Sequence, residues 1–320
     1  MRIGVIGIGI MGEYHTRVYR EITDSNPDVQ FKGVADIDKN RIHGIAKKYR
    51  TECYTDYKEL LDSGVDAVSI CVPTHLHKEV AIDAIEKGIS AILVEKPISD
   101  NISDALDIVN FARDKGVILT VGHVERFNPA VLLMKKIIGS GRLGRVVSIS
   151  AKRVGPGPPR YKDTGVIVDL AVHDLDIICY LYCACPTDVY AVAGEGKNGL
   201  EDRASIMLKF DGQRAGFLET NWLTSHKIRT LDIVGLEAVA HLDYIDQTIT
   251  ISEHEKEEEI KFSKQEPLMN ELSHFINVVS GKETPLVTGE DGIQALRLAL
   301  ASVESYRAGS VQRLCELPKP

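Results

Sequence analysis

The apolar residues of this chain follow two different spacing patterns, one before residue 122 and one after it. In the first part, short continuous apolar runs alternate with amphipathic segments of helical period, and such runs are typical of strands buried on both faces. This alternation predicts an α/β domain built on a doubly wound parallel sheet. The predicted strands are 2–6, 29–35, 51–54, 67–72, 89–94 and 117–121. The predicted helices are 11–22, one capped by Asp38 that runs through Tyr49, 56–62, 77–87 and one from Ser99 or Asn101 to Lys115.

Beyond residue 122 the strand-like runs follow one another without intervening helices. This pattern favours a large, open and mostly antiparallel sheet. Its predicted strands include 144–152, 204–210, 215–221, 228–234 and 248–251, and its predicted helices are 129–138, 166–181, 267–280 and 290–307. We therefore expect two domains, residues 1–122 and residues 123–320, with the last helix able to pack back on the first domain.

Composition narrows the kind of protein. The net charge of −8 argues against nucleic acid or an anionic membrane as a partner. The segment from Met1 to Gly7 lacks the features of a signal peptide, and no apolar stretch reaches the roughly 18 residues of a membrane helix. The six cysteines are scattered and complete neither a disulfide framework nor a zinc site. We expect a cytoplasmic protein that binds no metal.

A glycine-rich turn predicts a dinucleotide site. Gly7, Gly9 and Gly12 form a G-x-G-x-x-G run between the first strand and the first helix. These glycines permit a tight turn, a close approach of backbone to a pyrophosphate, and close helix–strand packing. Asp36 ends the second strand, where a carboxylate accepts hydrogen bonds from ribose hydroxyls and repels a 2′-phosphate. The predicted cofactor is NAD, although Lys39 or Arg41 leaves a contact with the 2′-phosphate of NADP open.

Further cofactor contacts are expected where later strands of the same sheet end, because ligands bind at that edge. For His77 a structural role at the start of a helix remains an alternative. The complete set of residues expected at the cofactor is Gly7, Gly9, Ile10, Met11, Gly12, Asp36, Val72, Pro73, Thr74, His77, Glu95 and Lys96.

Three residues are candidates for catalysis. Lys96 ends the strand 89–94, and the following proline holds it extended, so that its ammonium can point at a substrate. Asp169 and His173 are four residues apart and share a helix face. A neutral imidazole can accept a hydroxyl proton while a carboxylate orients the ring, and an ammonium favours the developing alkoxide. An ordinary exposed pair of side chains on a helix is the alternative for Asp169 and His173.

The order of these motifs resembles that of a known family. Gly7-x-Gly9-x-x-Gly12, Pro73-Thr74-His75-Leu76-His77, Glu95-Lys96-Pro97 and Asp169-x-x-x-His173 together are similar to the Gfo/Idh/MocA oxidoreductases. The resemblance covers essentially the whole chain. It implies a Rossmann domain followed by an α/β domain with an open antiparallel sheet, and a catalytic set of Lys96, Asp169 and His173 with His173 as base. Thr164-Gly165 stands where the family often has two glycines.

Two segments, 122–129 and 153–160, resemble a narrower branch, the UDP-N-acetylglucosamine 3-dehydrogenases. Their arginines and a nearby lysine concentrate positive charge in an acidic protein, and guanidinium groups suit a pyrophosphate. Ordinary surface arginines are the alternative, and Asn128 could instead cap the helix that starts at Pro129. The predicted substrate-binding residues are His123, Arg126, Asn128, Arg153, Arg160 and Lys162.

The leading hypothesis is NAD-dependent oxidation of a secondary hydroxyl of a nucleotide sugar, at C3 of UDP-N-acetylglucosamine. The alternatives are a dehydrogenase of a free sugar or an inositol-like cyclitol and a non-catalytic NAD-bound sensor. A free polyol has no phosphate for arginines to hold, and a sensor does not need the three candidate catalytic residues. A sheet covered by helices on one face only also predicts pairing of second domains into a homodimer or homotetramer.

Overall fold

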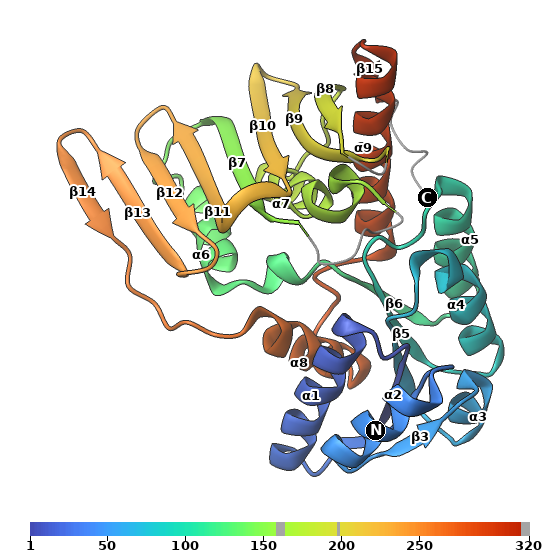
Figure 1. The fold of residues 1–320 in the computed structure, drawn as a ribbon. Coiled ribbons are helices and arrows are strands. Elements are labelled where there is room, and N and C mark those ends of the chain that lie inside the picture. The colour runs from blue at the N-terminus through green and yellow to red at the C-terminus, as the bar shows by residue number, and fades with distance from the viewer. Residues whose placement is uncertain (158–163, 197–198, 315–320) are drawn as a thin grey trace. The chain divides into compact units, whose positions relative to one another are not determined.

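The protein consists of two compact units, each with its own sheet (Figure 1). The computed structural model describes residues 1–157, 164–196 and 199–314. The first unit contains residues 1–124 and 266–293, and the second contains residues 125–265 and 294–320. The predicted fold class is confirmed: a parallel six-stranded sheet is followed by a mixed, mostly antiparallel one.

The sheet of the first unit has the strand order β3-β2-β1-β4-β5-β6, and all of its neighbours run parallel. Its strands are β1 (Arg2–Ile6), β2 (Gln30–Ala35), β3 (Glu52–Tyr54), β4 (Ala67–Ile70), β5 (Ala91–Glu95) and β6 (Ile118–Gly122). Its helices up to β6 are α1 (Ile10–Ser25), α2 (Lys39–Tyr49), α3 (Tyr57–Asp62), the short 3₁₀ helix η1 (Thr74–Leu76), α4 (His77–Glu86) and α5 (Ile102–Asp114). Polar caps fix several of these starts. Asp38 accepts hydrogen bonds from the backbone N–H groups of Asn40 and Arg41, as the sequence predicts.

The last part of the first unit corrects the predicted domain boundaries. Residues 266–293 were expected in the second domain, but α8 (Pro267–Val279) and the start of α9 (Gly289–Ala308) belong to the first unit. The physical reason is the apolar face of α8. Leu272 and Phe275 are buried in one core with Tyr19 and Ile22 of α1. The penultimate helix therefore completes the hydrophobic core of the first unit.

The second unit is a nine-stranded sheet with the order β14-β13-β12-β11-β7-β10-β9-β8-β15, in which only β7 and β10 pair in parallel among the described residues. Its strands are β7 (Val146–Pro156), β8 (Asp188–Glu195), β9 (Glu201–Phe210), β10 (Arg214–Asn221), β11 (Leu223–Gly235), β12 (Val239–Asp243), β13 (Thr248–Glu253), β14 (Lys256–Glu259) and β15 (Gln312–Arg313). Its helices are the 3₁₀ helix η2 (Val124–Phe127), α6 (Pro129–Gly139), the π-helical turn η3 (Ile167–Ala171), α7 (Val172–Tyr182) and most of α9.

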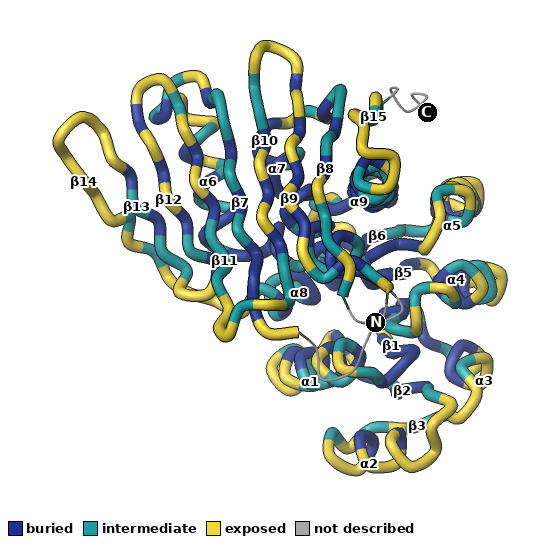
Figure 2. Tube along the Cα trace, turned by 45° about the horizontal axis from the view of Figure 1, so that its top comes forward, coloured by how far each residue is buried: buried dark blue, intermediate teal, exposed yellow. Residues whose placement is uncertain are grey.

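Helices cover one face of this second sheet. Side chains of α6, α7 and α9, such as Met134, Leu175 and Leu298, share its core. The strands alternate buried and exposed residues, which Figure 2 shows as alternating colours along β9 and β10. The uncovered face presents apolar side chains, including Met207 and Phe217, which lie opposite each other in neighbouring strands. None of the described helices combines the length and the apolar character that crossing a membrane requires.

Candidate active site

The glycine-rich turn has the geometry of a dinucleotide site. Gly7 has φ +87°, and a Cβ built on it would lie 2.6 Å from the backbone nitrogen of Val72. A Cβ on Gly12 would lie 1.8 Å from the carbonyl oxygen of Gly7, so α1 packs directly against the turn. Beside Gly9, by contrast, a Cβ would meet nothing within 4 Å. The turn is tight where it packs on the sheet and open where a pyrophosphate would approach the helix N-terminus.

Asp36 closes this turn at the end of β2. Its carboxylate oxygens accept hydrogen bonds from the backbone N–H groups of Ile8 (2.6 Å) and Asp38 (2.8 Å). Two apolar side chains, Ile10 at the start of α1 and Ile37 directly after Asp36, are 75% and 90% exposed. Apolar side chains this exposed suit the flat face of an adenine ring. Sequence reasoning missed Ile37, whose signal is an isolated apolar residue in a polar turn. The residues present therefore fit NAD.

Lys96 directly follows Glu95, whose buried carboxylate contacts a buried histidine. Glu95 ends β5, and one of its carboxylate oxygens lies 2.9 Å from Nε2 of His15 on α1. The other accepts a hydrogen bond from the backbone N–H of Lys96 (3.1 Å). Burial alone would raise the pKa of Glu95, but the hydrogen bond and charge of His15 and the charge of Lys96 lower it overall. The carboxylate of Glu95, a predicted cofactor contact, is engaged inside the unit, where it connects α1 with the backbone of Lys96.

His77 is a second buried histidine near Lys96, and its predicted role also changes. Its Nε2 lies 3.0 Å from the carbonyl oxygen of Val72, and its Nδ1 lies 3.0 Å from that of Pro97. Burial lowers the pKa of the ring, with the neighbouring carbonyl groups opposing this effect. Because only 1% of His77 is exposed, the structural alternative fits better than a cofactor contact. The ring joins the end of β4 to the loop after Lys96.

The candidate pair of the second unit lies where its helix changes winding. Asp169 belongs to the π-helical turn η3, and His173 lies in the first turn of α7. π-Helical turns within helices are frequent at functional sites. Asp169 is 9% exposed, and His173 is half-buried. The predicted helix is therefore divided into the π-helical turn η3 and the α-helix α7. Asp169, in η3, lies in the wall of a cavity.

Two predicted substrate-binding arginines are held inside the second unit by carboxylates. The Nε and Nη2 atoms of Arg153 donate hydrogen bonds to Asp174 (2.7 and 3.1 Å), and its Nη1 donates to Glu125 (2.8 Å). Arg126 forms a bidentate salt bridge with Asp176, in which its Nε and Nη2 atoms donate at 2.8 and 2.6 Å. Burial lowers the pKa of Arg153, but the two carboxylates raise it well above its ordinary value. Both guanidinium groups are thus engaged with carboxylates inside the unit, which favours a structural role over the predicted contact with a pyrophosphate.

The other predicted substrate residues are placed as follows. Asn128 caps α6 through a hydrogen bond from the N–H of Ala130 and donates to the carbonyl oxygen of Tyr244, both at 3.1 Å. The capping alternative is thus the correct one. His123 follows β6 and is 1% exposed. Arg160 and Lys162 lie outside the described residues, and their predicted roles remain predictions.

A cavity of about 160 Å³ adjoins Asp169 within the second unit. Its charged lining residues are Asp169, Arg153, Lys227 and Arg229, and Trp222 adds an indole ring. Burial and the charge of Arg153 lower the pKa of Arg229. Sequence reasoning missed Trp222, Lys227 and Arg229, because neither β11 nor the residue before it carries a local motif. Among the residues that the structure describes, no group of three or more His, Cys, Asp or Glu side chains is placed to hold a metal ion.

The all-parallel sheet, the glycine turn opening α1 and the carboxylate ending β2 define the first unit as the NAD-binding domain of an oxidoreductase. Comparison with known families agrees. Residues 1–123 match the profile described as "Oxidoreductase family, NAD-binding Rossmann fold", and residues 131–241 match "GFO/IDH/MocA C-terminal domain". The chain belongs to the Gfo/Idh/MocA family, and its cofactor is NAD.

Similar proteins extend over nearly the whole chain. The UDP-N-acetylglucosamine 3-dehydrogenase of Acidithiobacillus ferrooxidans is 28% identical over 96% of this chain and 98% of its own. The scyllo-inositol 2-dehydrogenase (NAD(+)) of Bacillus subtilis is 29% identical, covering 97% and 95%. A solved structure of the Acidithiobacillus enzyme superposes with a TM-score of 0.88 over 96% of this chain and 98% of that one.

Proposed function

We propose that this oxidoreductase oxidises a secondary hydroxyl of a nucleotide sugar, namely C3 of UDP-N-acetylglucosamine. The observation that carries the proposal is the full-length similarity, in sequence and in structure, to the UDP-N-acetylglucosamine 3-dehydrogenase. A cavity lined by Asp169 and also by two cationic side chains, Lys227 and Arg229, supports a negatively charged substrate.

The three candidate residues are assigned distinct roles. Bound NAD supplies the acceptor for the hydride that leaves the carbinol carbon. We assign His173 as the base that takes the hydroxyl proton at a ring nitrogen, and Asp169 as the carboxylate that favours the resulting imidazolium. The ammonium of Lys96 favours the developing alkoxide. The backbone N–H of Lys96 donates to Glu95, which His15 contacts in turn. The backbone from which the Lys96 side chain extends is therefore held in place.

A second candidate is oxidation of an inositol. It is favoured by the similarity to the scyllo-inositol enzyme and by a myo-inositol 2-dehydrogenase of Thermotoga maritima that is 27% identical over 95% of this chain. A polyol is neutral and leaves Lys227 and Arg229 without an anion to bind, which is why we rank this candidate second.

The test is NADH formation by the purified protein with three substrates supplied separately: UDP-N-acetylglucosamine, N-acetylglucosamine and myo-inositol. Of the three substrates, we expect only the UDP-sugar to be turned over. Its product should be identified as the 3-keto sugar by mass spectrometry and NMR. Turnover with myo-inositol and none with the UDP-sugar would transfer the proposal to the second candidate. NAD binding without turnover of any of the three would favour the sensor alternative.

We also propose that the protein forms a homo-oligomer through the uncovered face of the nine-stranded sheet. Val192, Met207 and Phe217 lie on this face and are 58%, 46% and 41% exposed. Light scattering at micromolar concentration should give a dimer or tetramer, and Phe217→Glu should yield monomers. Ile245→Glu, at a 52% exposed residue in the β12–β13 turn, is the control. A monomeric wild-type protein would contradict this assembly.

A further inference from the structure

Arg229 differs from the two buried arginines in how its donors are used. Arg153 and Arg126 direct their guanidinium groups into hydrogen bonds with carboxylates. The side chain of Arg229 makes no hydrogen bond to another residue in the described part of the chain, and its ion pair with Glu125 is long, at 3.7 Å. A guanidinium has five N–H donors, and leaving them unused in a half-buried position is costly. An arginine in this state is suited to an incoming anion.

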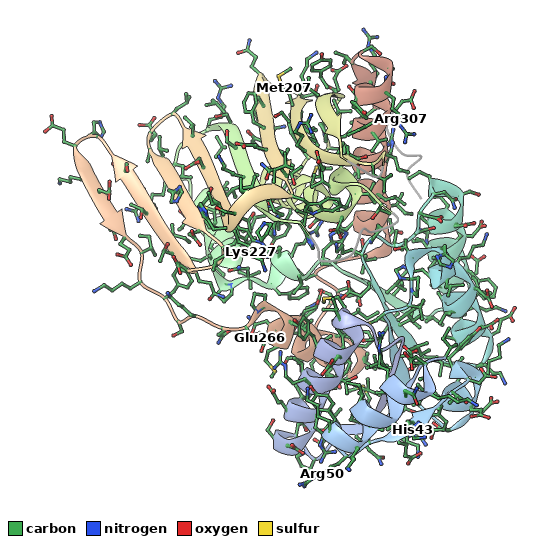
Figure 3. All side chains as sticks on the ribbon, in the orientation of Figure 1. His43, Arg50, Met207, Lys227, Glu266 and Arg307 are labelled. Carbon is green, nitrogen blue, oxygen red and sulfur yellow. The ribbon has the colours of Figure 1, made fainter. Side chains whose placement is uncertain are left out.

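Lys227 and Trp222 extend the same wall of the cavity. Lys227, labelled in Figure 3, lies on β11 two residues before Arg229, and its side chain forms no ion pair with any residue of the described ranges. Gly155 and Gly157 make room for this wall. A Cβ on Gly155 would lie 3.1 Å from Cγ of Lys227, and one on Gly157 would lie 3.3 Å from Cβ of Trp222. Gly155 in β7 and Gly157 directly after it therefore let the lysine and the indole lie close to the strand.

We propose that Lys227 and Arg229 form the subsite that holds the diphosphate of the substrate, with Trp222 as its apolar wall. This inference rests on the proposed nucleotide-sugar substrate and names the residues that recognise it. A cavity of about 160 Å³ is smaller than the roughly 300–1,000 Å³ of a complete ligand pocket, so it takes one part of the substrate. The nearness of Asp169 means that the anion lies on the β11 side of the cavity, away from that carboxylate.

Charge explains why an anionic group is the right ligand chemistry. Asp174 and Glu125 already neutralise Arg153, so the arginine deepest in the wall adds little attraction for a ligand. Arg229 and Lys227 supply two further positive charges, which Asp169 in the same wall and the long pair of Arg229 with Glu125 offset in part. A diphosphate can use both of these charges, whereas the carboxylate of a sugar acid matches only one.

The experiment compares Arg229→Gln and Lys227→Gln with the wild-type protein. Calorimetric titration with UDP, glucuronate and NAD separates the three ligand chemistries, and steady-state kinetics with UDP-N-acetylglucosamine gives kcat and KM. Loss of a charge-assisted contact at Arg229 should weaken UDP binding on the order of 10- to 100-fold. The more exposed Lys227 should contribute about 2- to 5-fold. NAD affinity should not change in either variant.

Arg142→Gln is the matched control, because the side chain of Arg142 is 34% exposed, close to the 32% of Arg229, but pairs with Glu258 at the surface. We expect it to bind UDP like the wild type. Unchanged UDP binding in Arg229→Gln together with a lower kcat would overturn the subsite and make Arg229 a support for the charge of Asp169. Tighter binding of glucuronate than of UDP would assign the cations to a sugar acid. If the wild-type protein binds no UDP-sugar, the proposed function fails; if it does and both variants bind it equally well, only the subsite fails.

Discussion

Lys96 and Asp169 are held in position by different kinds of structure. Lys96 follows a strand of a regular parallel sheet, and its immediate neighbour Glu95 fixes its backbone. Asp169 lies in a π-helical turn beside a cavity whose walls come from β7, β11 and the loop between β10 and β11. The first position depends on neighbours in the sequence, and the second on contacts between distant segments. The comparison indicates that the position of Lys96 is set by the regular sheet of the first unit, whereas the surroundings of Asp169 depend on how distant segments of the second unit pack.

The strongest test of this comparison removes the side chains that are proposed to be catalytic. Lys96→Ala and His173→Ala should each lower kcat by about 10²–10⁴-fold, as expected for groups that assist proton transfer. The double variant should lose far less than the product of the two, because residues that act as a unit are non-additive. Turnover and NAD affinity are measured for all three variants. Near-normal turnover of His173→Ala would remove it as the base.

Arg153→Gln tests whether the network of the second unit is structural. It leaves the carboxylates of Asp174 and Glu125 buried without their cation, and breaking such a pair costs about 3–5 kcal/mol. Arg142→Gln, at an exposed pair, should cost at most about 1 kcal/mol. Urea denaturation followed by circular dichroism measures the loss. If Arg153→Gln is as stable as Arg142→Gln, the buried arginine is not a structural element and the substrate role returns.

His15→Ala tests the corresponding support in the first unit. The pKa of Glu95 is depressed in the folded protein, so its ionised form stabilises the fold above its ordinary pKa, and this stability is lost as the pH falls through the folded pKa. Without His15, only Lys96 counteracts the rise in the pKa of Glu95 that burial causes. We expect a loss of about 1–3 kcal/mol at pH 7 that narrows toward pH 4.

His15→Gln is the control for this change, because a glutamine retains a donor for Glu95. It should recover most of the stability and of kcat. A loss at pH 7 that stays constant down to pH 4 would show that packing of His15, and not its contact with Glu95, supports Lys96. Urea midpoints at several pH values, with kcat at neutral pH, decide between the two.

The smallest expected effect is on cofactor preference. Asp36 is proposed to accept hydrogen bonds from ribose hydroxyls, and Asp36→Ala should therefore narrow the difference in binding free energy between NAD and NADP by about 1–2 kcal/mol. Fluorescence titration with NADH and NADPH measures both affinities. Arg41 lies within 4.0 Å of Asp38, so a double change, Asp36→Ala with Asp38→Ala, should help NADPH further if Arg41 then reaches the phosphate. An unchanged preference in both variants would place the discrimination elsewhere.

The sequence predicted the fold of the first unit and its glycine turn because their signals are local. Continuous apolar runs, an Asp cap and a G-x-G-x-x-G spacing each report on a few adjacent residues. The sequence did not predict the partners of Arg153 and Arg126, which are carboxylates 21 and 50 residues away. The local sequence around such an arginine does not distinguish it from one that binds a phosphate. Arg229 was overlooked for the same reason. Its cavity forms only when β7 and β11 pair.

The return of α8 to the first unit has a consequence for synthesis on the ribosome. The last strand of the parallel sheet ends at Gly122, but the helix that covers α1 begins at Pro267. At about 5–20 residues per second, the intervening chain takes on the order of ten seconds or more to be made. Throughout that interval the apolar side of α1, with Tyr19 and Ile22, has no partner from α8. The nascent protein therefore has a period in which a chaperone can bind this helix, and that period ends when Leu272 and Phe275 emerge.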